Sequence, residues 1–230
     1  MKKGKGKLIV IEGTDGSGKK TQVQLLIDRL QNEGHRVATA SFPQYGKKSA
    51  GPIEEYLNGN YGKSDEVSPY VASLFYAIDR FDAARDIKKF LSQGTLVVLD
   101  RYVDSNAGHQ GGKIKNIAER KKFIKWLYDI EFSVFGVPKP DLTIILHVPS
   151  AIGYELVYKK QQRLYLEEGK THDAHEADKE HLKNAEASYL WLAKQFPKDH
   201  GVIECVKYGK LLSPEEIHAL VWKQVLSRLK

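Results

Sequence analysis

A glycine-rich loop near the start of the chain has the residues and the spacing of a phosphate-binding loop (P-loop). It runs from Gly13 to Lys19, between an apolar segment that ends at Glu12 and an amphipathic helical pattern. Glycines permit a tight turn with inward-pointing backbone N–H groups, and the helix adds the positive end of its dipole. The terminal lysine supplies a charge for the β and γ phosphates of a nucleoside triphosphate. The predicted phosphate-binding residues are Gly13, Thr14, Asp15, Gly16, Ser17, Gly18, Lys19, Lys20 and Thr21.

One position of this loop departs from the usual pattern. The Ser or Thr that normally follows the lysine and ligates Mg²⁺ is replaced by Lys20, and Thr21 comes one residue too late. A metal ion here must therefore rely on carboxylates, for which Asp15 and Asp100 are the candidates. The alternative, a glycine-rich turn with no ligand, is disfavoured by the strand and helix patterns on either side.

A second acidic position follows another apolar run. Residues 96–99 precede Asp100, and Arg101 comes next. At the carboxyl edge of a parallel sheet, such an aspartate can lie beside a metal ion while the arginine clamps a phosphate through two hydrogen bonds. Without other motifs, an Asp-Arg pair at the end of a strand is a surface ion pair as often as it is a phosphate-binding site. Together with the loop, it predicts phosphoryl transfer with Lys19, Asp15 and Arg101 as catalytic residues.

Five short apolar runs are expected to form the strands that position these loops. They are residues 8–11, 37–42, 96–99, 142–148 and 202–206. Helical patterns alternate with them, over residues 21–32, 69–91 and 118–135, and Gly34 is a plausible C-cap of the first. This alternation predicts an α/β fold, a three-layer P-loop NTPase sandwich in which a five-stranded parallel sheet has helices on both faces.

Composition favours one domain over residues 1–230. The polar segment from Tyr154 to Phe196 predicts a helix, a mobile flap and a second helix, with the flap over about residues 154–175. Cys205 is the only cysteine, and no apolar run approaches the length of a membrane span, so we expect a cytoplasmic protein with no membrane partner. The net charge of +7 leaves open a P-loop ATPase or nucleic-acid-binding protein. Because the basic residues are interspersed with acids and form no stripe with aromatics, we expect no nucleic-acid partner.

An ordered set of motifs resembles the thymidylate kinase family of P-loop nucleoside monophosphate kinases. After the loop come Phe42 to Gly46, Asp79-Arg80, and Asp100 to Tyr102 with Ser105-Asn106. The likeness continues through Ile130 to Phe132, Gly136 to Asp141, and Asp173 to Glu176 before the helix that carries Tyr189. The resemblance implies transfer of the γ-phosphoryl group of ATP to dTMP, with Mg²⁺ between the nucleotides.

The resemblance also implies roles for individual side chains. Arg80 would donate to a thymine carbonyl and thereby reject cytosine, which presents an amino group there. Tyr76 would stack on the base, although aromatic residues in such a run are often core, and Asn106 would bond to the ring. His109 and His175 stand where relatives often carry aromatic residues, and they leave pH-sensitive binding open. The implied dTMP-binding residues are Asp15, Phe42, Tyr45, Tyr76, Arg80, Arg101, Asn106, His109 and His175.

The family places a catalytic cation either in the P-loop or in the flap. Gly16 stands where the first type has arginine, so the resemblance assigns the role to Arg163 in the flap, although a solvated charge run is the alternative. Glu176 would join Asp15 and Asp100 near the metal. A homodimer through helices between Ser68 and Phe135 is also implied. The rim histidines keep open a related kinase for another nucleoside monophosphate or a deoxynucleoside.

Overall fold

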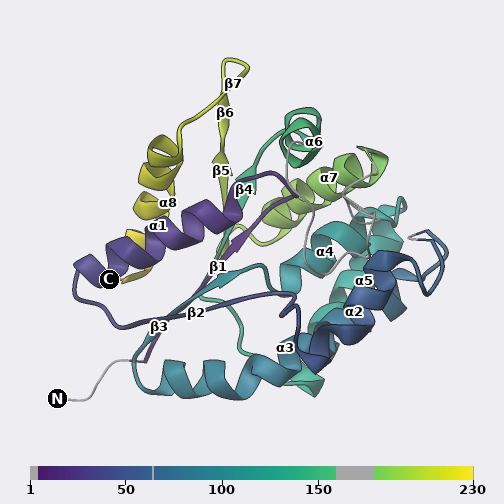
Figure 1. Cartoon of the computed structure of the whole chain (residues 1–230), viewed down its shortest axis with the longest axis horizontal. Coiled ribbons are helices and arrows are strands. Elements are labelled where there is room, and N and C mark those ends of the chain that lie inside the picture. Colours follow the sequence, from purple (N-terminus) through teal and green to yellow (C-terminus); the bar gives the residue numbers. More distant parts are fainter. Residues whose placement is uncertain (1–4, 64, 159–178, 230) are drawn as a thin grey trace.

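Five parallel strands form the centre of the computed structural model, which describes residues 5–63, 65–158 and 179–229 (Figure 1). In spatial order they are β2 (Val37–Ser41), β3 (Leu96–Asp100), β1 (Leu8–Glu12), β4 (Leu142–His147) and β5 (His200–Glu204). All of β1 is buried, as expected for a central strand covered on both faces. Ile11 is opposite Asp100 in the register. The ends of β1 and β3 therefore lie together at the carboxyl edge of the sheet.

Helices cover both faces of this sheet. On one face, α1 (Lys19–Asn32) and α8 (Pro214–Leu229) share an apolar core with the strands. The other face is covered by α3 (Pro69–Ser92), α4 (Val103–Gly112), α5 (Ile117–Tyr128) and α7 (Lys179–Gln195). The predicted α/β sandwich with a five-stranded parallel sheet is therefore confirmed.

Several elements go beyond the sequence predictions. These are α2 (Gly51–Asn58), α4, α8, the short helix η1 (Lys48–Ala50), and a hairpin of β6 (Val206–Lys207) and β7 (Lys210–Leu211). The helix expected over residues 118–135 is α5 continued by a π-helix, η2 (Asp129–Val134). Gly34, just beyond the last turn of α1, has a φ of 82°, which confirms the predicted glycine end of that helix.

The predicted flap, about residues 154–175, begins within α6 (Ser150–Tyr158), so its first residues are helical. Residues 159–178, with the side chains of residues 157 and 158, lie outside the described part of the chain, so a single domain with a flap stays a prediction. Within the described ranges, no helix combines the length and apolar composition needed to cross a membrane.

Two glycines let α4 and α7 pack closely. A Cβ at Gly108 would lie 2.4 Å from the ring of Tyr189, and a Cβ at Gly112 would lie 2.8 Å from the backbone of Asn184. Real Cβ atoms do not approach other atoms this closely, so a side chain at either position would force the helices apart. This contact fixes the face of α4 that carries Asn106 and His109.

Candidate active site

The P-loop joins β1 to α1, as predicted, and its glycines are needed for different reasons. Gly13, Gly16 and Gly18 all have positive φ, which side chains rarely adopt. A Cβ at Gly13 would also lie 2.6 Å from the carbonyl oxygen of Leu146. A Cβ at Gly16 would lie 2.5 Å from the carbonyl oxygen of Gly153 in α6. An arginine at position 16 therefore has no room in this structure.

Lys19 is folded back onto the P-loop. Its Nζ donates to the carbonyl oxygens of Gly13, at 3.0 Å, and Thr14, at 2.8 Å. Burial, with a smaller contribution from the nearby Arg101 charge, lowers the pKa of Lys19 to about 7. An anionic phosphate beside this ammonium would favour its charged form and compete with the carbonyl oxygens. Lys20 and Thr21, in contrast, are exposed on the first turn of α1.

Arg101 reaches from the end of β3 across the P-loop. Its Nη2 donates to Oδ1 of Asp15 at 2.7 Å, and its Nη1 donates to the carbonyl oxygen of Gly13 at 3.3 Å. Burial alone would lower its pKa, but Asp15 and the other acidic groups around it together outweigh burial, and the pKa of Arg101 is raised well above its usual range. Its φ of 66° is strained for a residue with a side chain, and such strain is concentrated at functional sites. The guanidinium is therefore fixed in place as a permanent charge.

Asp100 has a carboxylate oxygen that is ready for a ligand. Its Oδ1 is buried and has no hydrogen-bond partner among the described residues. Those residues also contain no group of three or more His, Cys, Asp or Glu side chains that could hold a metal. Mg²⁺ is usually held by one or two carboxylates together with water and substrate phosphates. Asp100 and the neighbouring Asp15 fit such a site.

Glu12, at the end of β1, is a residue whose role the sequence did not reveal. Its carboxylate is fully buried and accepts hydrogen bonds from the backbone N–H of Tyr102 at 2.7 Å, Ser105 Oγ at 2.7 Å and Tyr189 Oη at 2.9 Å. Burial, with a contribution from the Asp104 charge, raises the pKa of Glu12 to about 7. This one side chain joins the P-loop strand to α4 and α7.

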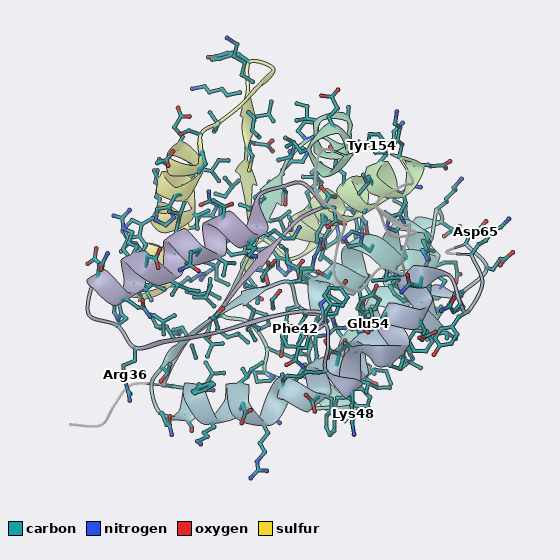
Figure 2. All side chains as sticks on the ribbon, viewed as in Figure 1. Arg36, Phe42, Lys48, Glu54, Asp65 and Tyr154 are labelled. Carbon is teal, nitrogen blue, oxygen red and sulfur yellow. The ribbon has the colours of Figure 1, made fainter. Side chains whose placement is uncertain are left out.

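A cavity next to the P-loop collects the residues assigned to the acceptor nucleotide. Phe42 is buried, and its label lies near the middle of the molecule in Figure 2. His175 lies outside the described residues, but every other predicted dTMP-binding residue lines this cavity. They are Asp15, Phe42, Tyr45, Tyr76, Arg80, Arg101, Asn106 and His109. The cavity holds about 60 Å³, less than a nucleotide needs, so side chains must move when a nucleotide enters.

The two residues of the Asp79-Arg80 motif contact different parts of the chain: Asp79 binds the loop after β2, and Arg80 pairs with Glu131. Asp79 Oδ2 accepts the backbone N–H of Gln44 at 2.8 Å, and Asp79 Oδ1 accepts Ser49 Oγ at 2.7 Å, which fixes the loop after β2. Arg80 is buried at the cavity, where its Nε donates to both oxygens of Glu131, at 2.9 and 3.1 Å, and its Nη2 forms an ion pair with the same carboxylate. The sequence motifs contained Glu131 but did not reveal this pairing.

Gln110 is a second residue that sequence reasoning missed. It follows His109 on α4, lines the cavity, and is 1% exposed. Its Oε1 is buried without a hydrogen-bond partner among the described residues. A buried amide oxygen without a partner is costly unless a ligand satisfies it. In the sequence, the only indication of a role for Gln110 was its position next to His109, a predicted pocket residue.

His109 differs from the titrating rim histidine that the sequence left open. Its Nε2 lies 3.2 Å from Nη1 of Arg101, its Nδ1 lies 3.1 Å from Nε2 of His181, and its ring stacks on that of His181. Burial, then Arg101 and His181, lower the pKa of His109 well below its ordinary value. His109 is thus neutral at physiological pH. The other flap predictions, Arg163 and Glu176, lie outside the described residues, as does His175.

The parallel sheet, the glycine-lined loop and the paired Asp15 and Arg101 define a P-loop nucleotide-binding protein. A thymidylate kinase family model matches residues 11–204. Thymidylate kinase from Mycobacterium tuberculosis is 36% identical over 189 residues, which is 82% of this chain and 86% of that protein. The enzyme from Pelotomaculum thermopropionicum is 30% identical over 217 residues, or 94% of this chain and 93% of that protein.

The structure of a thymidylate kinase from Candida albicans matches the fold with a TM-score of 0.70. It covers 97% of this chain and 92% of the Candida chain at 22% identity, so this likeness bears on the fold alone. With the family match and the bacterial relatives, the chain belongs to the thymidylate kinase family. This membership confirms the resemblance found in the sequence and makes the chain a kinase of that type.

We predict that Glu12→Gln changes the pH dependence of stability. Because folding raises the pKa of this carboxyl group to about 7, the native state keeps its proton at pH values where the unfolded state has lost it. The wild-type free energy of unfolding should therefore fall as the pH rises from about 4.5 to 7. Glu12→Gln should lose about 1–3 kcal/mol less over this window. Urea unfolding at pH 4.5 and 7.5 measures the difference, with the exposed Glu33→Gln as control, and parallel profiles would contradict the prediction.

Proposed function

We propose that this chain transfers the γ-phosphoryl group of ATP to dTMP, giving dTDP and ADP. The observation that carries this proposal is one cavity whose lining combines a fixed cation beside the P-loop with hydrogen-bonding side chains from α3 and α4. Arg101 and Asp15 line this cavity, and Lys19 lies next to it, where it donates to the same carbonyl oxygen of Gly13 as Arg101. Arg80 and Gln110 line the same cavity as Arg101. A phosphate ester of a planar base fits this distribution of charge and hydrogen-bonding groups.

Positioning and charge stabilisation are the means of catalysis. Lys19 would leave the carbonyl oxygens of Gly13 and Thr14 for the β and γ phosphates of ATP. Arg101, oriented by Asp15, would hold the 5′ phosphate of the acceptor in line with the γ phosphate. Charge spreads over the equatorial oxygens in the transition state, so fixed cations there lower the barrier with no covalent enzyme intermediate.

Magnesium is the metal that best fits the acidic groups at this edge of the sheet. Asp15 and Asp100, whose Oδ1 has no hydrogen-bond partner among the described residues, would hold it directly or through water. Bound there, Mg²⁺ would neutralise charge on the phosphates of the two nucleotides. Lys20 is exposed and takes no part in this ligand set. Glu176 remains a proposed third carboxylate from the flap.

Thymine recognition falls to Arg80, with Gln110 and Asn106 beside it. Glu131 occupies one edge of the Arg80 guanidinium, which orients the remaining N–H groups. A donor facing a base carbonyl accepts thymine and opposes the amino group of cytosine. Tyr76 is half-buried at the cavity, and its ring is our candidate to stack on the base.

A further cation is proposed to come from the flap. Gly16 packs against Gly153 and leaves no space for an arginine in the P-loop. Arg163 is therefore our candidate for the group that neutralises the transferring phosphoryl, and His175 is our candidate for a residue that covers the sugar. We place the reaction in the cytoplasm, in keeping with a chain whose single cysteine, Cys205, is a buried free thiol.

A homodimer is proposed through α3. Val71, Leu74, Ile78 and Phe81 recur at helical spacing on one face of α3, and each is between 36% and 55% exposed. Exposed apolar residues that form one contiguous stripe are typical of a protein interface. The stripe lies within the range predicted from the sequence, residues 68–135.

The reaction is tested with alternative acceptors. In a coupled ADP-release assay with Mg-ATP, we expect kcat/KM for dTMP to exceed that for dUMP, dCMP, dGMP and thymidine, and to exceed that for dCMP by more than about tenfold. Lys19→Ala should lower kcat by about 10²–10³, because it removes a cation from the transferring group. The exposed Lys194→Ala on α7 is the control. Preference for another acceptor would replace the proposed substrate, and turnover of none of them would refute the reaction.

Glu131 is predicted to act as a positioning residue for Arg80. Glu131→Gln should raise KM for dTMP about tenfold and reduce discrimination against dCMP, while KM for ATP stays unchanged. The reason is that Gln loses the charge that fixes the guanidinium. Asp129→Asn, an exposed change on the same π-helix, is the control. Equal losses for both nucleotides would assign Glu131 a purely structural role.

Dimerisation is predicted to depend on the α3 stripe. Ile78→Asp and Phe81→Asp should each convert a dimer to a monomer in sedimentation velocity at micromolar concentration, because they place a charge in an apolar interface. Tyr208→Asp, on the β6–β7 hairpin and 93% exposed in the wild type, is the control. A wild-type monomer, or dimers that survive both changes on α3, would refute the proposed interface.

A further inference from the structure

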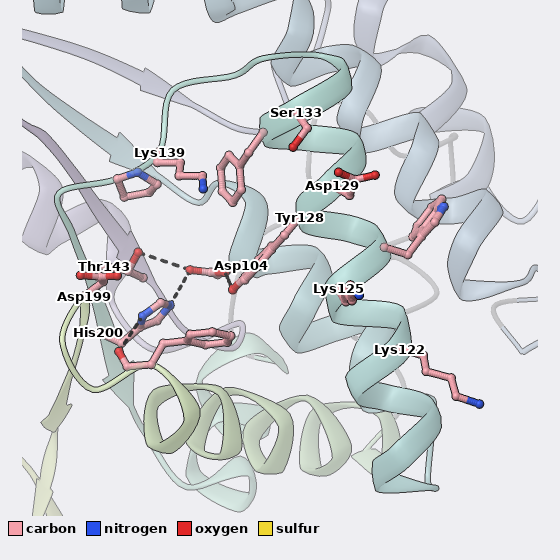
Figure 3. A pocket seen from close by; sticks show the side chains of 14 residues that line it. Asp104, Lys122, Lys125, Tyr128, Asp129, Ser133, Lys139, Thr143, Asp199 and His200 are labelled. Carbon is pink, nitrogen blue, oxygen red and sulfur yellow. Dashed lines mark hydrogen bonds and ion pairs between the residues drawn. The ribbon is translucent and has the colours of Figure 1, made fainter.

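A second and larger cavity borders the acceptor site without being part of it. It holds about 720 Å³ between α5, η2 and the turn from α7 to β5 (Figure 3). Neighbouring residues separate the two spaces, because Asp104 lines this cavity while Ser105 lines the acceptor cavity. Phe132 lines it next to Glu131, which holds Arg80. The two cavities share no described lining residue, so this one requires its own explanation.

Aromatic rings form a continuous wall of this cavity. The ring centroids of Phe132 and Tyr128 are 5.3 Å apart, those of Tyr128 and Phe196 are 5.6 Å apart, and those of Phe196 and His200 are 5.8 Å apart. Phe196 is 37% exposed although it belongs to this wall. A chain of rings in contact presents a surface on which a flat apolar ligand can stack.

The polar groups at the base of the cavity satisfy one another. Asp104 accepts from Tyr128 Oη at 2.6 Å, from His200 Nε2 at 2.9 Å and from Thr143 Oγ1 at 3.3 Å. The second nitrogen of His200 pairs with the carbonyl oxygen of Phe196. These bonds, drawn as dashed lines in Figure 3, hold the rings in fixed positions. A ligand would therefore meet a preformed apolar wall here, with no unsatisfied polar group at its base among the described residues.

Cations lie at the mouth of the cavity. Lys139 Nζ is 5.4 Å from the centroid of Phe132, and Lys125 is exposed nearby. Neither lysine makes an ion pair with a described carboxylate, whereas Lys122 is committed to Glu119 at 2.9 Å. Figure 3 shows Lys139 extending toward the aromatic wall. Two carboxylates, Asp129 and Asp199, also line the cavity, and of the lysines Lys139 is the one placed over a ring of the aromatic wall.

We propose that this cavity is a binding site for a flat aromatic molecule that carries one anionic group. The rings of Phe132, Tyr128 and Phe196 would contact the aromatic system, and Lys139 would pair with the anion. A volume of this size, walls of aromatic side chains and a few polar groups are the usual properties of a small-molecule site. The site is independent of the proposed reaction, because binding here uses none of the residues assigned to either nucleotide.

The probe for the experiment is 8-anilinonaphthalene-1-sulfonate, an aromatic sulfonate whose fluorescence rises on transfer from water to an apolar site. The full-length protein is titrated with it in saturating dTMP and the nonhydrolysable ATP analogue AMP-PNP, which block the nucleotide sites. We expect saturable binding with one site per chain. N-phenyl-1-naphthylamine, which lacks the sulfonate, is titrated in parallel to separate the contribution of the rings from that of the charge.

Two variants test where the probe binds. Lys139→Glu should weaken the sulfonate about tenfold and leave the uncharged probe within about twofold, while Lys121→Glu, on α5 but outside the cavity, should change neither. Ser133→Trp, which places a large ring in the cavity, should abolish both signals. If circular dichroism shows that Ser133→Trp is unfolded, the comparison of Lys139→Glu with Lys121→Glu alone tests the proposal. Sulfonate binding that is unaffected by Lys139→Glu, or that disappears when dTMP and AMP-PNP are added, would overturn the proposal.

Discussion

The arrangement of the site depends on the hydrogen bonds that the buried carboxylate of Glu12 accepts. It stands where β1 becomes the P-loop, and it accepts hydrogen bonds from Tyr102, Ser105 and Tyr189. Those three residues lie just after β3, on α4 and on α7. One side chain at the end of the central strand thus fixes the distance between the donor loop and the acceptor cavity. Burial is costly for a charged group, and burial together with the nearby Asp104 charge raises the pKa of this carboxyl group.

The cations of the site are held before any phosphate arrives. Arg101 is fixed by Asp15, by the carbonyl oxygen of Gly13 and by a strained backbone. Lys19 is held by carbonyl oxygens that a phosphate can displace. The two groups therefore differ: the guanidinium keeps its charge throughout the physiological pH range, whereas the charge of the buried ammonium depends on what lies beside it. Preorganised charge of this kind reduces the reorganisation that phosphoryl transfer requires.

Local patterns predicted the loop and strands well, and they failed where distant residues decide the outcome. The P-loop follows from glycine spacing between a strand and a helix, and the five strands from buried apolar runs. The pairing of Arg80 with Glu131 joins residues 51 positions apart, and η2 places that glutamate through a local π-helical turn that no composition indicates. Similarly, α4 was missed because its glycines, which lower helix propensity, are there for contact with α7. The lowered pKa of His109 comes from its burial and from the nearby Arg101 and His181, an environment that only the folded chain assembles.

Gly16 affects both the packing of the P-loop and the position of the catalytic cation. The sequence showed only that position 16 lacks the arginine that some relatives have there. In the structure, α6 approaches the P-loop so closely that a Cβ at position 16 would lie only 2.5 Å from the carbonyl oxygen of Gly153. The same helix leads directly into the segment that carries Arg163. Close packing of α6 therefore excludes an arginine from position 16, and the same helix precedes the segment from which we propose that the catalytic cation comes. A bulkier residue at position 16 would therefore displace α6 from the P-loop.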